Sequence, residues 1–349
     1  MWRWDYSLSQ ARRVRPMSDP GAAFDRITAL LRTAPNTPGA WSELVLVARA
    51  SAREDEAIAT CIHAVDADPT LHYALRALLH LIPDEPGGEG QAVVAADTAR
   101  LPTSVVVCSN DDQQFAAMAA SYERALAGWP HEIVRIADAS SLAEGYTRGI
   151  AAASGAVIIF SHDDVELLAA DLGARLTRRL AECDVLGVAG ATRASGPAWS
   201  FAGWPYLHGL VIYPEGNGYK VTVYSRIAPL AHGIRVMDGV FLAMRRETAR
   251  TVGFDARTCD GFHGYDLDFT LRAAKAGLRL AVATDLGLVH QSYGSFDERW
   301  QAAARNLMAR HPELNGVPGE MTGFEPRSVP SAKHAMALVD NWARIGRPT

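Results

Sequence analysis

Short apolar runs alternate with amphipathic segments through the middle of the chain. Residues 103–108, 131–136 and 156–161 contain Val and Ile runs that are typical of buried strands in a parallel sheet. Residues 114–126 and 142–153, which lie between these runs, carry apolar positions at helical spacing. Strands that alternate with helices predict a right-handed wound α/β sheet.

The first 90 residues instead predict helices, because apolar positions recur at three and four while Pro and Gly separate the segments. One helix is expected over residues 54–67, another begins at Trp41, and residues 21–34 and 70–82 are expected to flank this pair. The stretch from Ala40 to Pro69 resembles a tetratricopeptide repeat, in which small residues let paired helices approach closely. We expect this region to be either a docking surface for a protein partner or a structural cap.

A stretch rich in Gly, Pro and acidic residues, from Pro83 to Gly90, predicts a linker. The chain is therefore expected to have three parts. They are a helical tetratricopeptide-like domain with its linker over residues 1–90, an α/β domain over residues 91–300 and a C-terminal helical extension over residues 301–349.

The composition narrows the possible functions. The chain has 349 residues, of which 48% are hydrophobic and 21% charged, enough for a sizeable core and more than one domain. A net charge of -5 without basic runs argues against a nucleic-acid partner, and no apolar stretch approaches the ~18 residues of a transmembrane segment. The four cysteines lack metal-site spacing and the N-terminus lacks a secretory h-region, so we expect a cytoplasmic protein with free thiols.

Polar residues stand where each of the three predicted strands ends. They are Ser109, Asn110 and Asp111, then Asp138, then His162, Asp163 and Asp164. The carboxyl ends of parallel strands face one crevice, which is where a nucleotide lies in a doubly wound sheet. Asp138 is expected either to hold a ribose or uracil edge or to be a solvated loop residue or a helix cap.

The third strand end is the most informative of the three. Two adjacent carboxylates directly after a buried strand are placed to hold a cation. The alternative is a strand-to-helix turn, in which Asp163 or Asp164 caps a helix that starts near Val165. Because that alternative leaves the other Asp and His162 unexplained, the sequence favours a cation site.

From Ser104 to His290 the chain resembles family 2 glycosyltransferases, which are nucleotide-sugar-dependent enzymes with a GT-A fold. The segments that carry the resemblance are residues 105–111, 140–149, 162–164, 237–243 and 264–272. It implies a GT-A-type doubly wound mixed sheet and a metal-dependent, inverting hexosyltransferase. The implied donor is a nucleotide-sugar, namely a UDP-sugar, and the acceptor hydroxyl belongs to a glycan, a lipid-linked sugar or a protein.

The resemblance also implies roles for individual residues. The donor-binding positions are Ser109, Asn110, Asp111, Asp138, Arg148, His162 and Asp163. The acceptor-side positions are Asp238, Gly239 and Tyr265. The implied metal ligands are Asp164 and His290, and the cation is Mn²⁺ or Mg²⁺, of which imidazole suits Mn²⁺ better.

Three positions depart from the family pattern. Thr147 stands where Asn is common, Tyr265 stands where Glu is common, and His162 replaces the first Asp of an Asp-x-Asp motif. A neutral imidazole carries one less negative charge than a carboxylate. It is therefore expected to weaken cation binding or to contact the nucleotide instead.

Inverting transfer also needs a base that removes the proton of the acceptor hydroxyl. Asp266 opens a predicted helix that stops at Gly277, and it is the candidate base. Asp268 is expected to be a supporting group that pairs with Arg272 at i+4. The alternative is that both acids only complement the helix dipole. For His290, which follows the apolar run 278–289, the alternative to metal binding is a structural role.

Two other functions fit parts of the sequence. A nucleotidyltransferase would use the same carboxylates, but no Gly-rich basic loop follows the first predicted strand. A non-catalytic scaffold with a degenerate transferase domain would explain His162 and Thr147. Aromatic residues from Trp199 to Tyr224 are expected either to stack on an acceptor sugar or to be buried in hinges.

Overall fold

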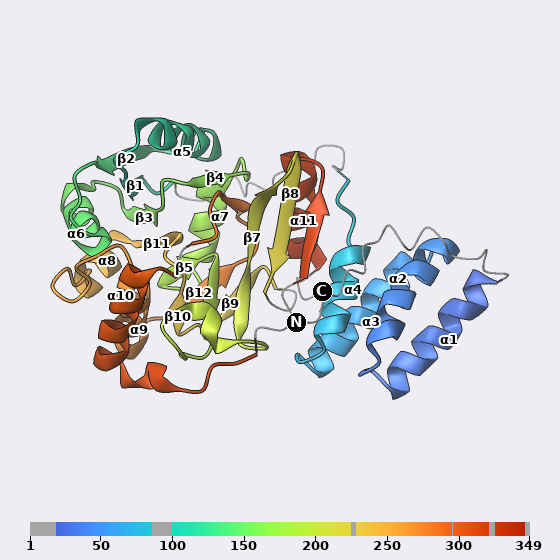
Figure 1. Ribbon diagram of the computed structural model, residues 1–349. Helices are drawn as coiled ribbons and strands as arrows, with labels where there is room; N and C mark the ends of the chain where they lie inside the picture. The colour runs from blue at the N-terminus through green and yellow to red at the C-terminus, as the bar shows by residue number, and fades with distance from the viewer. Residues whose placement is uncertain (1–18, 86–99, 225–227, 295, 321–324, 346–349) are drawn as a thin grey trace. The chain divides into compact units, whose positions relative to one another are not determined.

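The computed structural model describes residues 19–85, 100–224, 228–294, 296–320 and 325–345 (Figure 1). Internal contacts divide the chain into two compact units, Met1–Leu81 and Ile82–Thr349. The second unit carries the candidate site.

Helices form the described part of the first unit. They are α1 (Pro20–Thr33), α2 (Pro38–Ser51), α3 (Glu54–Ala67) and α4 (His72–Leu81). α1 packs against α2 and α3 packs against α4, while α2 also contacts both α3 and α4. Trp41 on α2 is buried, and its indole N–H donates to the carbonyl of Pro35 at 2.7 Å. The predicted helices are therefore confirmed, whereas the tetratricopeptide assignment and the protein partner stay predictions.

The first sheet of the second unit has the strand order β2-β1-β3-β11-β5-β12-β9. Its strands are β1 (Thr103–Cys108), β2 (His131–Ile136), β3 (Val157–Ser161), β5 (Val185–Gly187), β9 (Leu230–His232), β11 (Phe241–Arg245) and β12 (Leu280–Ala283). β1 pairs in parallel with both β2 and β3, as the alternation of strands and helices predicts. β11 runs antiparallel to β3 and β5, so the mixed α/β sheet implied by the resemblance is confirmed.

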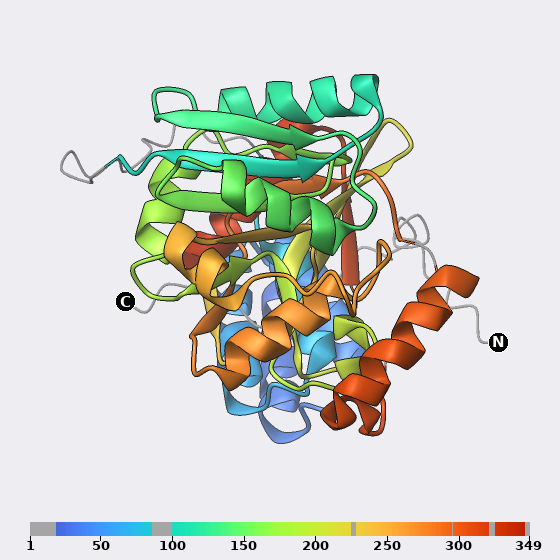
Figure 2. The ribbon, with the colours of Figure 1, turned by 90° about the vertical axis from the view of Figure 1, so that its left-hand side faces the viewer.

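Helices cover both faces of the parallel strands. They are α5 (Asp112–Ala125) and α6 (Leu142–Ala152). Because side chains alternate along a strand, Val105 and Val107 of β1 pack in the same cluster as residues of α5, while Val106 packs with α6. Figure 2 shows the two helices on opposite sides of these strands. Gly149 lets α6 lie directly on β1, since a Cβ there would come within 2.1 Å of Val106 Cγ1.

The second sheet has the order β10-β6-β7-β13-β4, with β8 beside β7 and β14 beside β8. Its strands are β4 (Val165–Leu167), β6 (Ala189–Ala191), β7 (Leu207–Glu215), β8 (Gly218–Val223), β10 (Val236–Met237), β13 (Leu288–His290) and β14 (Glu325–Val329). Residues 162–164 connect β3 of the first sheet with β4 of the second. The turn between the two sheets is therefore the segment that the sequence marks as a cation site.

Further helices complete the described part of this unit. They are α7 (Leu172–Arg179), α8 (Arg246–Val252), α9 (Tyr265–Lys275), α10 (Glu298–Arg310) and α11 (Ala332–Ile345), with the 3₁₀ helices η2 (Trp199–Ala202) and η3 (Pro312–Asn315). α11 packs against β8 and β14, and η3 follows α10 directly.

One local expectation is corrected by the structure, and one apolar run is divided between the two sheets. The capping alternative for Asp163 and Asp164 is wrong, because Val165 begins strand β4 and not a helix. The apolar run 278–289 is interrupted at residues 284–287, so that its two ends become β12 and β13 in different sheets. In both cases pairing with distant strands decides the local structure.

All four cysteines are free thiols. Across the described ranges, none of the helices combines the length and the apolarity needed to cross a membrane.

Candidate functional site

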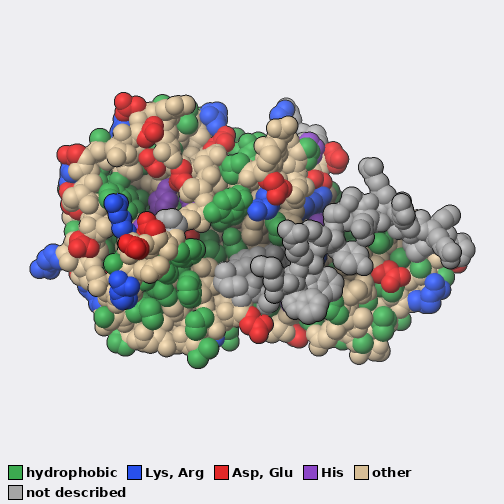
Figure 3. Space-filling view, viewed as in Figure 1, with side chains coloured by type: hydrophobic (Ala, Val, Ile, Leu, Met, Phe, Trp, Pro, Cys, Tyr) green, Lys and Arg blue, Asp and Glu red, His purple; other side chains and the backbone are tan. Residues whose placement is uncertain are grey.

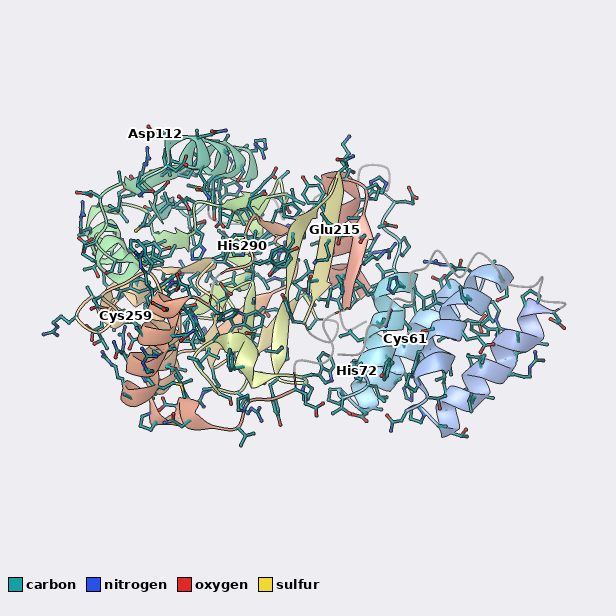
Figure 4. The ribbon with its side chains drawn as sticks, viewed as in Figure 1. Cys61, His72, Asp112, Glu215, Cys259 and His290 are labelled. Atoms are coloured by element: carbon teal, nitrogen blue, oxygen red, sulfur yellow. The ribbon has the colours of Figure 1, made fainter. Side chains whose placement is uncertain are left out.

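Strand pairing brings His290 next to the turn between the sheets. β13 runs antiparallel to β4, with His290 opposite Val165, and the amide of Gln291 donates to the carbonyl of Asp164 at 2.9 Å. The other end of the turn is held where the amide of His162 donates to the carbonyl of Val240 at 3.2 Å. In Figure 4, His290 lies beside β7, and Figure 3 shows histidine surface recessed between acidic and hydrophobic side chains on this face of the unit.

Three side chains meet at this point in an arrangement that can hold a metal ion. One potential ligand atom from each of His162, Asp164 and His290 lies within 4.8 Å of the others. His290 Nε2 is 3.3 Å from Asp164 Oδ2, and His162 Nδ1 is 3.8 Å from Asp164 Oδ1. Oδ1 is buried and has no hydrogen-bond partner among the described residues. Such an oxygen is costly to bury without a partner, so its environment is suited to a cation.

The protonation states of Asp164 and His162 also fit metal binding, whereas His290 would bind a metal only after losing a proton that Asp164 stabilises. Burial alone would raise the pKa of Asp164, but hydrogen bonding and charge attraction from His290, with Ser292 and His162, lower it to about 2. Burial and the neighbouring His290 lower the pKa of His162. Burial lowers the pKa of His290, but the hydrogen bond and the negative charge of Asp164 outweigh burial, so the pKa of His290 is raised. A carboxylate and a neutral imidazole are therefore present at neutral pH, and these are the forms that coordinate metals.

Tyr265 contacts the site from the first turn of α9. Its side chain is buried among aromatic rings, with the centroid of the Tyr146 ring at 5.6 Å, and its hydroxyl lies 2.8 Å from His162 Nε2. If His162 Nε2 carries the proton and donates it to Tyr265, Nδ1 presents a lone pair toward Asp164. The sequence placed Tyr265 on the acceptor side, and the structure brings its hydroxyl to a candidate metal ligand.

Asp266, in the first turn of α9, and Asp238, in the loop between β10 and β11, are two further carboxylates that influence each other. Asp266 is partly buried, and its Oδ2 accepts from the amide of Gly239 at 3.0 Å. Burial, and then the charge of Asp238, raise the pKa of Asp266 to about 7. A Cβ on Gly239 would come within 2.2 Å of the Tyr265 hydroxyl, so this close approach of the loop to α9 requires glycine. Asp238 itself accepts from Trp199 Nε1 at 2.7 Å and from the amide of Val240 at 2.9 Å.

Asp268, by contrast, lies in a network of cations. It is 1% exposed and accepts from Arg272 Nε at 2.8 Å, which confirms the predicted i+4 pair. His311 Nε2 is 2.9 Å and Arg310 Nε 3.4 Å from its Oδ1. The two acids of the helix are thus separated, with Asp266 at the loop that carries Asp238 and Asp268 tied to α10 and the segment that follows it.

The remaining donor-side candidates follow β1 and β2. Asp111 caps α5 by accepting from the amides of Gln113 and Gln114 at 2.8 and 2.9 Å, and the buried Ser109 hydroxyl donates to the Asp111 carbonyl at 3.1 Å. Asn110 is exposed between them. Asp138 forms an exposed ion pair of 2.7 Å with Arg148, and Asp163 is partly buried in the turn before Asp164. These contacts give Asp111 a structural role and leave the nucleotide contacts of the group as predictions.

An aromatic wall extends from His290, and three of its residues belong to the aromatic-rich segment from Trp199 to Tyr224. The Tyr213 ring of β7 lies 6.2 Å from the His290 ring and stacks on Tyr293 at 4.6 Å and 12°. The Tyr213 and Tyr224 hydroxyls are 3.5 Å apart, and Tyr224 packs edge-on against Trp199 at 5.0 Å. Tyr293 has no local motif, and its contact with Tyr213, which is far away in the chain, is set by the tertiary structure.

Comparisons with known proteins give a family for this chain and similar solved structures. Residues 104–310 match the family described as "Glycosyltransferase like family". The chain is similar to the crystal structure of GalNAc-T7 with UDP, GalNAc and Mn²⁺, with 14% sequence identity and a TM-score of 0.35. This match covers 56% of the present chain and 45% of the GalNAc-T7 chain. The crystal structure of A197 from STIV is 12% identical, with coverages of 56% and 97% and a TM-score of 0.31. The chain thus spans less than half of the GalNAc-T7 chain, and no curated protein matches it.

Proposed function

The chain belongs to the glycosyltransferase-like family, and from this premise we propose that it catalyses metal-dependent, inverting transfer of a hexosyl group from a UDP-sugar to an acceptor hydroxyl. The acceptor would be a glycan, a lipid-linked sugar or a protein. The observation that carries the proposal is the cluster of His162, Asp164 and His290, with one buried carboxylate oxygen that lacks a partner among the described residues.

The donor set of this cluster suits a divalent cation. One carboxylate and two imidazoles favour Mn²⁺ over Mg²⁺, which prefers oxygen ligands. A cation bound there would supply positive charge against the diphosphate leaving group. Asp164 is the anionic ligand, and the two histidines lie on either side of it.

Tyr265 supports this proposal through His162. An acceptor for the Nε2 proton fixes the tautomer in which Nδ1 is free to coordinate, as the hydrogen-bond partners of metal-binding histidines do. A tyrosine hydroxyl thus orients the imidazole that replaces the first Asp of the motif.

Asp266 is the proposed base. Its pKa of about 7 places the ionised and protonated forms in balance near neutral pH, which is favourable for general-base catalysis. The oxygen of the acceptor hydroxyl forms a bond to the anomeric carbon while its proton passes to the Asp266 carboxylate. The bond from that carbon to the diphosphate oxygen breaks on the opposite side, so the configuration inverts.

The donor nucleotide is proposed to lie on the side of β1 and β2. Asp238 and Gly239 would face the acceptor, and the nucleotide would contact Ser109, Asn110, Asp111, Asp138, Arg148 and Asp163. The first unit remains a proposed docking surface for a protein partner.

The proposal is tested by thermal shift with UDP, UTP and GDP, each with and without Mn²⁺. We expect UDP to stabilise the protein only when Mn²⁺ is present, and Asp164→Ala to remove that shift. Stabilisation by UTP together with a sugar phosphate would favour a nucleotidyltransferase. No shift with any nucleotide would favour a scaffold.

A further inference from the structure

One face of the second sheet carries a row of side chains that begins at the candidate metal site. Val165 of β4 is opposite His290 of β13, and Val289 is aligned with Ile212 of β7, so His290 and Tyr213 are neighbours on one face. Tyr213 is opposite Lys220 of β8, and Lys220 is opposite Ser328 of β14. The row therefore places a metal ligand, an aromatic ring and a cation side by side.

Tyr293 covers the middle of this row and remains accessible. Its ring stacks on Tyr213, yet 64% of the residue is exposed. The Lys220 ammonium lies 5.1 Å from the centroid of the Tyr293 ring. An exposed aromatic ring held in place by a second ring is suited to stacking against the C–H face of a sugar.

Lys220 is available to a ligand. Within the ranges that the structure describes, its ammonium has no carboxylate at ion-pair distance. Glu215, which lies on the same face of β7, is hydrogen-bonded to Ser328. A lysine ammonium that lies over an aromatic ring keeps its hydrogen-bond donors free for an anionic group.

The position of the row separates it from the donor nucleotide. The 162–164 turn lies between the two sheets, with β1 and β2 in the first and β7 and β8 in the second. Neighbouring strands are about 4.8 Å apart, so Lys220 is about 10 Å from the strand of His290. A sugar ring can span this distance, with its reacting hydroxyl at the candidate metal site near His290 and a second substituent at Lys220.

The row also continues toward the proposed base. The hydroxyls of Tyr213 and Tyr224 lie close together, and Tyr224 packs against Trp199. The Trp199 indole donates to Asp238, and the amide of the next residue, Gly239, donates to Asp266. The aromatic wall thus runs from the metal ligand to the loop at the base.

We propose that Tyr293 and Lys220 form an acceptor subsite for a sugar that carries an anionic group, either a carboxylate or a phosphate ester. This inference rests on the proposed function, because the subsite is assigned to the acceptor of that reaction. The sugar ring stacks on Tyr293, and the Lys220 ammonium binds the anionic substituent.

The test measures sugar binding to the full chain at saturating UDP and Mn²⁺. Calorimetric probes are methyl glucoside, methyl glucuronide and glucose 6-phosphate, together with the galactose counterparts. We expect one acidic sugar to bind roughly tenfold more tightly than its neutral counterpart, as a charge-assisted hydrogen bond provides. The uronide and phosphate arms identify which anion is recognised.

Matched variants assign the effect to the two residues. Lys220→Met should abolish the preference for the acidic sugar, Lys220→Arg should retain it, and Lys333→Met, at an exposed lysine of α11, should leave it unchanged. Tyr293→Ala should weaken neutral and acidic sugars alike, whereas Tyr293→Phe should not. A preference that falls as salt rises would agree with the charge pairing.

The outcomes separate this inference from the proposed function. Normal UDP binding with equal or absent binding of neutral and acidic sugars overturns the anionic subsite alone. Weaker UDP binding in Lys220→Met also overturns it, because Lys220 would then contact the donor. If the wild type does not bind UDP with Mn²⁺, the proposed function fails and the subsite fails with it.

Discussion

Replacing Asp238 by Asn should move the acid limb of the pH–rate profile to lower pH. Burial and the charge of Asp238 raise the pKa of Asp266 to about 7. The substitution removes a negative charge, which stabilises ionised Asp266 and lowers its pKa. The base is then deprotonated at a lower pH, and activity should persist further into the acid range.

The magnitude follows from the geometry of the loop. Asp266 accepts from the amide of Gly239, the residue after Asp238, which places the two carboxylates roughly 6–8 Å apart. With an effective dielectric constant of ~20, their repulsion is about 2–3 kcal/mol, or ~1.5–2 pKa units. Both side chains are partly exposed, and salt and solvent screening reduce the expected shift to about one unit.

The assay is nucleotide release with acceptor, measured as kcat/KM from pH 5 to 9 at saturating Mn²⁺. An Asn side-chain oxygen cannot replace both Asp238 oxygens, which accept separately from Trp199 and Val240. Trp199→Phe is therefore the control, because it removes one hydrogen bond and keeps the charge. We expect it to lower the rate without moving the limb. An acid limb that stays near pH 7 in Asp238→Asn would refute the charge coupling.

Other substitutions test the remaining parts of the site. Asp164→Ala should abolish Mn²⁺-dependent UDP binding in calorimetry. If the variant instead binds UDP and Mn²⁺ with the affinity of the wild type, the cluster holds no metal. Tyr265→Phe should weaken Mn²⁺ binding roughly 10–100-fold without changing metal-free stability by more than about 1.5 kcal/mol, as expected for a partner that only orients His162. Asp266→Asn should lower turnover roughly 10²–10⁴-fold. Asp266→Asn should also raise the melting temperature more at pH 8 than at pH 5. In the wild type, Asp266 ionises less easily in the folded than in the unfolded state, so its ionisation destabilises the native state as pH rises through about 7. Asp268→Asn should lower the free energy of unfolding by about 3 kcal/mol, since it leaves Arg272 and its cationic neighbours without their buried anion, and urea denaturation measures this.

The sequence by itself determined the elements whose signals are local. β1 and β2 coincide with the predicted runs, and α9 begins one residue before Asp266, because strand and helix periodicities are set by neighbouring residues. The gathering of polar groups after β1, β2 and β3 also follows from parallel pairing. The contact of Asp268 with Arg272 follows from helix geometry alone.

Tertiary structure alone decided the elements that depend on distant partners. Val165–Leu167 is too short for its own periodicity to define it, and its pairing with β13 makes it a strand. The same pairing brings His290 to Asp164, and the alignment of β13 with β7 adds Tyr213 to the site. The register between strands far apart in the chain depends on the packing of the whole sheet, so it is not encoded in any single segment. The sequence therefore identified most of the chemical groups and, through the family resemblance, the meeting of Asp164 with His290, while strand register added Tyr213 to them.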